Sequence, residues 1–129
     1  MHSDYTTIRV SAADGIGHIM LDRPRALNAF NAALMAEVTT ALRAFEGDRA
    51  IRAVVLSGEG RAFSAGFDLK EAAVNNYTTA VEWRGAIAAA FDFIMQFWDC
   101  RKPTIAAVHG FCVGGGLELA TAAHLRVGD

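Results

Sequence analysis

The expected fold is decided by the stretch Val108-His-Gly-Phe-Cys-Val-Gly-Gly-Gly-Leu-Glu-Leu-Ala-Thr-Ala-Ala123. The apolar run that leads into it, Thr104 to Val108, is rich in β-branched residues and begins after Pro103, which predicts a buried strand. Three consecutive glycines follow, and then good helix formers from Leu117 to His124. The pattern therefore predicts a strand, a glycine-rich turn and a helix.

The three glycines stand where the helix begins. Because glycine destabilises a helix, such a run indicates that backbone N–H groups are exposed to a ligand. Amides at a helix N-terminus, with the helix dipole, favour an anion or a developing oxyanion. Glu118 lies three residues beyond Gly115, on the same helix face. An amide and a carboxylate facing one space suit proton chemistry beside a polarised carbonyl. The alternative is that the glycines only permit close packing and that Glu118 complements the dipole.

Composition and charge exclude several classes of function. The chain has 129 residues, of which 53% are hydrophobic, and a net charge of −2, so we expect one folded domain and no nucleic-acid partner. We expect no signal peptide, because the first residues lack a basic and an apolar region, and no apolar run reaches membrane-spanning length. Cys100, Cys112 and the four histidines show no metal-ligand spacing, so we expect reduced thiols and no metal. A cytoplasmic α/β protein without membrane contact is expected.

Strand and helix patterns alternate along the chain. Two β-type runs, 6–10 and 18–21, flank Ala13-Asp14-Gly15, which predicts a hairpin. Hydrophobic residues at helical spacing predict a helix from Asn31 to Gly47, and the apolar run Arg52 to Ser57 predicts a buried strand. This alternation favours an α/β architecture with at least partly parallel strands.

The longest predicted helix begins at a capping box formed by Thr79 and Glu82. One of its faces is strongly hydrophobic, and we expect that face to pack in the core or against another subunit. Its residues are Trp83, Ile87, Phe91, Ile94 and Trp98. Leu125 to Val127 then has the character of another strand with nothing after it to cover it. We therefore expect the chain to be a fragment, or to need another chain.

Four blocks in register resemble the N-terminal half of the enoyl-CoA hydratase/isomerase (crotonase) family, and the match covers nearly the whole chain. They are Arg23-Pro-Arg-Ala-Leu-Asn-Ala-Phe-Asn31, the strand Ala53 to Gly58, Phe63-Ser-Ala-Gly-Phe-Asp-Leu-Lys-Glu71, and Lys102-Pro-Thr-Ile-Ala-Ala-Val-His-Gly-Phe-Cys-Val-Gly-Gly-Gly-Leu-Glu-Leu-Ala120. The resemblance implies a spiral of β-β-α units, the crotonase-like fold, in trimers or pairs of trimers. It implies no cofactor, because coenzyme A is part of the substrate.

By position, the resemblance implies an oxyanion hole made by the backbone N–H groups of Phe67 and Gly115. These would bind the thioester carbonyl of an acyl-CoA and stabilise an enolate. The Phe67 side chain would only shape the acyl pocket. Glu118 matches one of two glutamates with which hydratases of the family activate water, and the other belongs to a later segment. We therefore expect 2-enoyl-CoA hydration by the gene product and no activity of the isolated chain.

The resemblance also implies that two segments contact the adenine and phosphates of coenzyme A. Their residues are Arg25, Ala26 and Leu27 in the first, and Ala65, Asp68, Leu69 and Lys70 in the second. Arg25 and Lys70 would pair with phosphates, unless they are only solvated surface charges. Other reactions on this scaffold, namely isomerisation, dehalogenation and thioester hydrolysis, stay open, as does a non-catalytic acyl-CoA-binding role.

Overall fold

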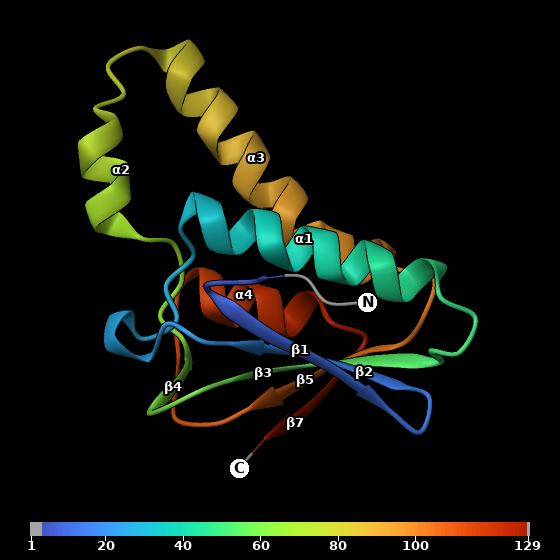
Figure 1. Cartoon of the computed structure of the whole chain (residues 1–129). Helices are drawn as coiled ribbons and strands as arrows, with labels where there is room; N and C mark the ends of the chain where they lie inside the picture. Colours follow the sequence, from blue (N-terminus) through green and yellow to red (C-terminus); the bar gives the residue numbers. More distant parts are fainter. Residues whose placement is uncertain (1–3, 129) are drawn as a thin grey trace.

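The computed structural model describes residues 4–128, which form three consecutive β-β-α units and one further strand (Figure 1). The first unit contains β1 (Ile8–Ala13), β2 (Ile16–Leu21), a short 3-10 helix η1 (Pro24–Ala26) and α1 (Ala32–Gly47). The second contains β3 (Ala53–Gly58), β4 (Ala62–Ser64), α2 (Leu69–Asn75) and α3 (Ala80–Asp99). The third contains β5 (Thr104–Val108), β6 (Phe111–Cys112) and α4 (Gly115–Ala122), and β7 (Leu125–Gly128) follows. The expected alternation of strands and helices is confirmed.

Two sheets carry these units. The larger one has the strand order β1-β2-β3-β5-β7, and β4 pairs with β6 in the smaller one. Only β1 and β2 are antiparallel, and they form the predicted hairpin, in which Asp14 and Gly15 both have positive φ angles. The other pairs, β2–β3, β3–β5 and β5–β7, are parallel. The carboxyl ends of β2, β3 and β5 consequently meet at one edge, where loops build binding sites in parallel sheets.

The core lies between the larger sheet and the helices α1, α3 and α4, which cover the same face of it (Figure 1). The helix α1 begins where the Asn31 side chain accepts a hydrogen bond from the Leu34 N–H. Its buried stripe packs mainly against β2 and β1, within one core that also includes buried residues of β3. The core includes Leu34, Val38, Leu42, Phe45, Ile19, Leu21, Val54 and Leu56. The opposite face of the sheet has no helix, and Leu125 and Val127 are each 59% exposed there.

The helix α3 differs from its expected packing. The predicted capping box of Thr79 and Glu82 is present. In the hydrophobic stripe, however, only Ile94 is buried, and the other four residues are 47–64% exposed. The residues that α3 does bury are Phe93, Ile94 and Phe97. The stripe therefore does not lie in the core of this chain, and its packing against another subunit stays a prediction. The first half of α3 projects from the body together with α2 (Figure 1).

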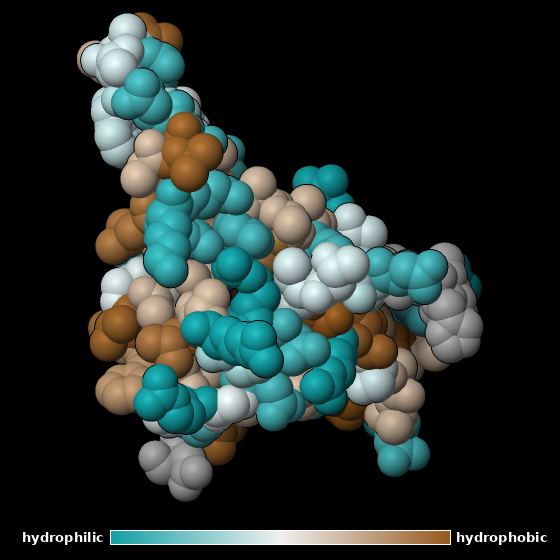
Figure 2. Space-filling view, turned by 60° about the vertical axis from the view of Figure 1, so that its left-hand side comes forward, coloured by the Kyte–Doolittle hydropathy of each residue, from teal (hydrophilic) through white to brown (hydrophobic). Residues whose placement is uncertain are grey.

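Hydrophobic side chains therefore lie on the surface of the α2–α3 projection (Figure 2). Val74 and Val81 are about four-fifths exposed. None of the helices in residues 4–128 is both long and apolar enough to cross a membrane.

Candidate functional site

Two glycines bring together the segments that follow β4 and β6. Gly66 has a φ angle of +95°, and a Cβ atom added to it would lie 2.6 Å from the Gly115 nitrogen. A Cβ atom on Gly115 would lie 3.4 Å from the Gly66 Cα. Backbone therefore contacts backbone here, and only glycine permits so close an approach. This contact is compatible with both alternatives for the glycine run, namely close packing of the backbone and exposure of N–H groups to a ligand.

The N–H groups of Phe67 and Gly115 have no hydrogen-bond acceptor within the described part of the chain. Their neighbours do: Gly66 O accepts from the Phe30 N–H at 2.7 Å, and the Asp68 N–H donates to Phe30 O at 3.0 Å. Buried amides are normally paired, and Gly115 is a buried residue. Two available donors thus lie at the Gly66–Gly115 contact, as an oxyanion site would require.

Glu118 lies one helical turn into α4 and lines a cleft of about 630 Å³ between α3 and α4. Phe67 lines the same cleft, and the remaining lining is mainly hydrophobic. The full set is Phe67, Ile87, Ala90, Phe91, Ile94, Met95, Trp98, Glu118, Thr121 and Ala122. Four of the five residues of the α3 stripe, all except Trp83, therefore form one wall of this cleft. Glu118 is its only carboxylate among residues 4–128.

The Phe67 ring lies between Phe30 and the start of α4. It packs edge-on against Phe30, with ring centroids 5.4 Å apart. A Cβ atom on Gly115 would lie 2.6 Å from its Cε2 atom. The ring thus covers the start of α4 and forms the end of the cleft nearest the available amides, so it can limit what reaches them.

The two segments predicted to contact coenzyme A are adjacent in the structure. The Ala65 N–H donates to Leu27 O at 2.9 Å. Arg25 is exposed on η1, and a shallow hollow there is lined by Arg23, Pro24, Arg25 and Ala26. Leu69 and Lys70 are exposed at the start of α2. The structure thus places the two segments side by side at Leu27 and Ala65, and the contact of the seven residues with coenzyme A stays a prediction.

Besides its predicted contact with coenzyme A, Asp68 has a structural role. Its carboxylate accepts hydrogen bonds from the N–H groups of Lys70 and Glu71 and so caps α2. The Arg23 guanidinium lies 3.2 Å from the same carboxylate. The Glu71 N–H first, and then Arg23, outweigh partial burial and hold the pKa of Asp68 below its ordinary value of 3.8. Asp68 is therefore an anion at neutral pH, which places a negative charge beside any phosphate bound by Arg25 or Lys70.

Sequence reasoning missed the residue that holds these loops together. Asn28 is fully buried at a φ angle of +56°. Its side-chain oxygen accepts from the Arg23 N–H, and its amide donates to Glu59 O and Ala62 O at 3.0 and 2.9 Å. Asn tolerates the left-handed conformation and is typical of turns, which is the only signal that could have identified it.

Other reactive side chains in the neighbourhood are engaged or protonated. Nε2 of His109 donates to Gly60 O at 2.6 Å, which is a structural role. Burial raises the pKa of the Cys112 thiol above its ordinary 9.0, so at neutral pH it is not the thiolate nucleophile. Within residues 4–128, no three His, Cys, Asp or Glu side chains are placed to hold a metal ion.

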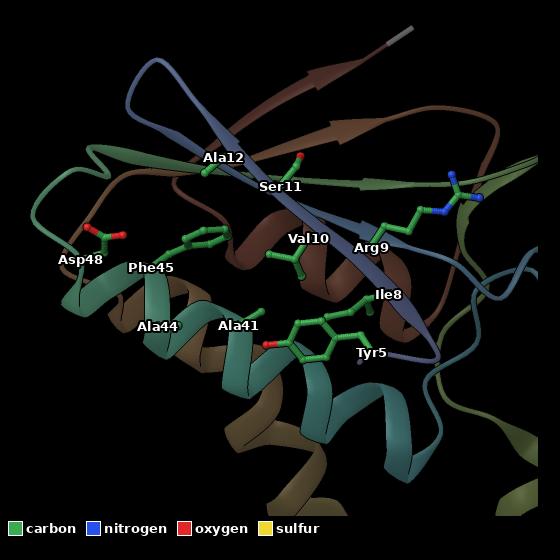
Figure 3. Close-up of a pocket in the computed structure, with 10 residues that line it drawn as sticks. All are labelled: Tyr5, Ile8, Arg9, Val10, Ser11, Ala12, Ala41, Ala44, Phe45 and Asp48. Atoms are coloured by element: carbon green, nitrogen blue, oxygen red, sulfur yellow. The ribbon is translucent and has the colours of Figure 1, made fainter. Parts of the chain in front are cut away.

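A second cavity of about 470 Å³ lies between β1 and α1, away from these residues (Figure 3). Tyr5 and Val10 face α1, whereas Arg9 points away from it and pairs with Asp22. The cavity contains no residue of the predicted site. Its lining offers no carboxylate other than Asp48, and the available amides lie elsewhere, so it is not the candidate site.

Comparisons with known proteins agree on one family. The family model described as enoyl-CoA hydratase/isomerase matches residues 11–129. A probable enoyl-CoA hydratase of Rhizobium meliloti is 45% identical over 116 residues, which are 90% of this chain and 43% of that protein. The human mitochondrial Delta(3,5)-Delta(2,4)-dienoyl-CoA isomerase is 35% identical over 131 residues, which are 95% of this chain and 40% of that protein.

Among solved structures, an enoyl-CoA hydratase/isomerase from Xanthobacter autotrophicus Py2 superposes with a TM-score of 0.93 at 39% identity, over 96% of this chain and 46% of that one. The predicted crotonase-like α/β fold is thereby confirmed. The chain spans less than half the length of the curated relatives it matches.

Proposed function

This chain belongs to the enoyl-CoA hydratase/isomerase family, and from that membership we propose that its gene product acts on acyl-CoA thioesters, with hydration of 2-enoyl-CoA as its reaction. The observation that carries the proposal is the pair of unpaired N–H groups, those of Phe67 and Gly115, at the contact between Gly66 and Gly115. A thioester carbonyl placed there would receive both donors. Removing one such donor from another enzyme raises the activation barrier by about 2.7–4 kcal/mol, so two donors would contribute substantially to the rate.

In the proposed reaction, Glu118 acts as the acid–base group that transfers the proton. Attack of water at the β-carbon moves an electron pair through the double bond onto the thioester oxygen, which becomes an enolate held by the two amides. A carboxylate takes the proton from the attacking water, and the α-carbon then receives a proton. Glu118 lines the cleft that begins at Phe67, so it lies on the side where the acyl carbons would extend.

A second candidate, isomerisation of the double bond, is favoured by one observation. Among residues 4–128, Glu118 is the only carboxylate lining the cleft. One carboxylate suffices to remove a proton from the α-carbon and return it at the γ-carbon, whereas the family's hydratases use two glutamates. The isomerase among the relatives is consistent with this candidate.

For the rest of the substrate, we propose that Arg25 and Lys70 bind the phosphates of coenzyme A. Both are exposed, and both flank the contact between Leu27 and Ala65. The Asp68 carboxylate is paired with the Arg23 guanidinium, which offsets part of its repulsion of a phosphate. We also propose that the enzyme is cytoplasmic. We propose in addition that it assembles as a trimer or a pair of trimers, and light scattering of the gene product would test this assembly.

The deciding experiment offers the whole gene product crotonyl-CoA and, separately, 3-hexenoyl-CoA. With crotonyl-CoA, a loss of the absorbance of the conjugated thioester supports hydration. With 3-hexenoyl-CoA, the appearance of that absorbance supports isomerisation. Calorimetry with butanoyl-CoA on the same protein, and on the 129-residue chain alone, measures binding separately. Binding without turnover would support the non-catalytic alternative. The absence of both binding and turnover would refute an acyl-CoA function.

A further inference from the structure

We propose that Ser64 is a positioning residue that sets the place of both amide donors, and that it acts through the backbone rather than on substrate. This inference rests on the proposed function for its kinetic consequence, and on the geometry alone for its structural one. Ser64 is the last residue of β4 and is fully buried. Its hydroxyl takes part in two backbone hydrogen bonds and Ser64 lines none of the cavities described above, so we do not assign it as a nucleophile.

The Ser64 hydroxyl joins two backbone groups of different loops. It donates to Asn28 O at 2.9 Å and accepts from the Gly66 N–H at 3.0 Å. Gly66 precedes Phe67, so the hydroxyl fixes the turn in which the Phe67 N–H is left unpaired. Since Asn28 is itself held by three hydrogen bonds through its side chain, the hydroxyl anchors that turn to a rigid support.

The main chain of Ser64 holds the other donor segment. Its carbonyl oxygen accepts from the Val113 N–H at 3.2 Å, immediately before the glycine run. The same oxygen would lie 2.2 Å from a Cβ atom on Gly116. One buried residue is therefore hydrogen-bonded on one side to the segment of Phe67 and on the other to the segment of Gly115. A displacement of Ser64 would change the separation of the two donors.

Catalysis by oriented donors is sensitive to such displacements, since an error of about 1 Å can cost on the order of 100-fold in rate. Ser64→Ala leaves Asn28 O and the Gly66 N–H without their shared partner. The expected result is a kcat that is lower by about 10-fold to 100-fold with KM nearly unchanged, because the coenzyme A contacts are not altered. Ser64→Cys keeps a weak donor and acceptor of similar size and is expected to lie between Ser64→Ala and wild type.

The control is Thr104→Val. Thr104 is also fully buried, and its hydroxyl also joins two backbone groups, since it donates to Phe97 O in α3 and accepts from the His124 N–H after α4. It stands at the opposite end of β5 from the site. Thr104→Val is expected to lower the free energy of unfolding as Ser64→Ala does, but to leave kcat unchanged.

Two further readouts separate positioning from general destabilisation in the whole gene product. Infrared difference spectra of bound butanoyl-CoA, labelled with ¹³C at the carbonyl, report the hydrogen bonds to the thioester oxygen. The downshift of that band is expected to shrink in Ser64→Ala and to persist in Thr104→Val. Hydrogen exchange of peptides covering residues 62–68 and 111–116 is expected to accelerate in Ser64→Ala only, and this arm needs no substrate.

The outcomes are distinguishable. If the wild type neither binds butanoyl-CoA nor turns over an enoyl-CoA, the proposed function fails, and the exchange experiment alone decides the structural role of Ser64. If the wild type is active and Ser64→Ala keeps kcat, the carbonyl band and slow exchange, the positioning role is overturned. Should Ser64→Ala fail to fold, Ser64→Cys carries the same tests, and wild-type values in all three would overturn it equally.

Discussion

The Phe67 ring lies against Gly115 so closely that a Cβ atom on Gly115 would be 2.6 Å from Cε2 of the ring. The residue that would supply one backbone donor therefore limits, through its side chain, the residue that would supply the other. This contact makes the two positions interdependent, and they should not respond to substitution as independent sites.

We expect Gly115→Ala to destabilise the protein by about 1–3 kcal/mol, because the added methyl group overlaps the ring. Phe67→Ala removes the obstacle, so the same Gly115→Ala change should cost clearly less in that background. Urea unfolding of the four members of this double-mutant cycle measures the coupling. Additive effects of the two substitutions would contradict the described contact.

We expect Glu118→Gln to lower kcat by about 100-fold to 10,000-fold in the whole gene product, because the amide cannot accept the proton. Affinity for butanoyl-CoA and the free energy of unfolding should change little, since the Glu118 side chain is exposed. Asp99→Asn is the matched control: it removes an exposed carboxylate from α3 that does not line the cleft. Unchanged turnover in Glu118→Gln would remove Glu118 from the mechanism.

We expect Asp68 to contribute a pH-dependent part of the stability. Because the folded chain lowers the pKa of this carboxyl, its contribution is complete above the ordinary value of 3.8 and is lost as the pH falls through the lowered value. Asp68→Asn keeps an oxygen for the helix cap but loses the charge, and should cost about 1 kcal/mol at pH 6.

The difference in the free energy of unfolding between wild type and Asp68→Asn should accordingly shrink as the pH is lowered from 6 to 2.5. Urea titrations at several pH values measure it. A difference that stays constant over this range would show that the charge of Asp68, through its bonds to the Glu71 N–H and Arg23, does not stabilise the fold.

We expect Asn28→Ala to destabilise the protein by about 3 kcal/mol or more, because three backbone groups lose their partner in the interior. Asn28→Gly loses the same hydrogen bonds but accommodates the φ angle of +56°, so it should be about 1 kcal/mol more stable than Asn28→Ala. Thermal or urea unfolding decides, and equal stability of the two variants would argue against a backbone constraint at this position.

Much of this arrangement could be predicted from the sequence because local signals agreed with the tertiary structure. The hairpin at Asp14-Gly15, the capping box of Thr79 and Glu82, and the strand from Thr104 to Val108 are each specified by neighbouring residues, and all three are present. The contact of Gly66 with Gly115 joins segments that are distant in the sequence, and only the family resemblance, which pairs the N–H groups of Phe67 and Gly115, indicates that these segments meet.

What could not be predicted depends on geometry that periodicity does not contain. The hydrophobic stripe of α3 has the spacing of a core face, yet only Ile94 of it is buried, because α3 packs in the core through Phe93, Ile94 and Phe97 instead. Likewise, nothing in the local sequence indicates that Asn28 and Ser64 share a buried network, since the hydrogen bonds from Asn28 to Glu59 and from Ser64 to Asn28 span 31 and 36 residues. Such polar contacts follow from the folded topology.

The strand β7 has a hydrogen-bonded neighbour, β5, on one side only within residues 4–128, and it presents Leu125 and Val127 to solvent. A strand with free backbone groups and hydrophobic side chains is a template for sheet growth by further strands. Handled as an isolated polypeptide, this chain should therefore aggregate edge to edge as its concentration rises, and a charged residue at position 127 should improve its solubility.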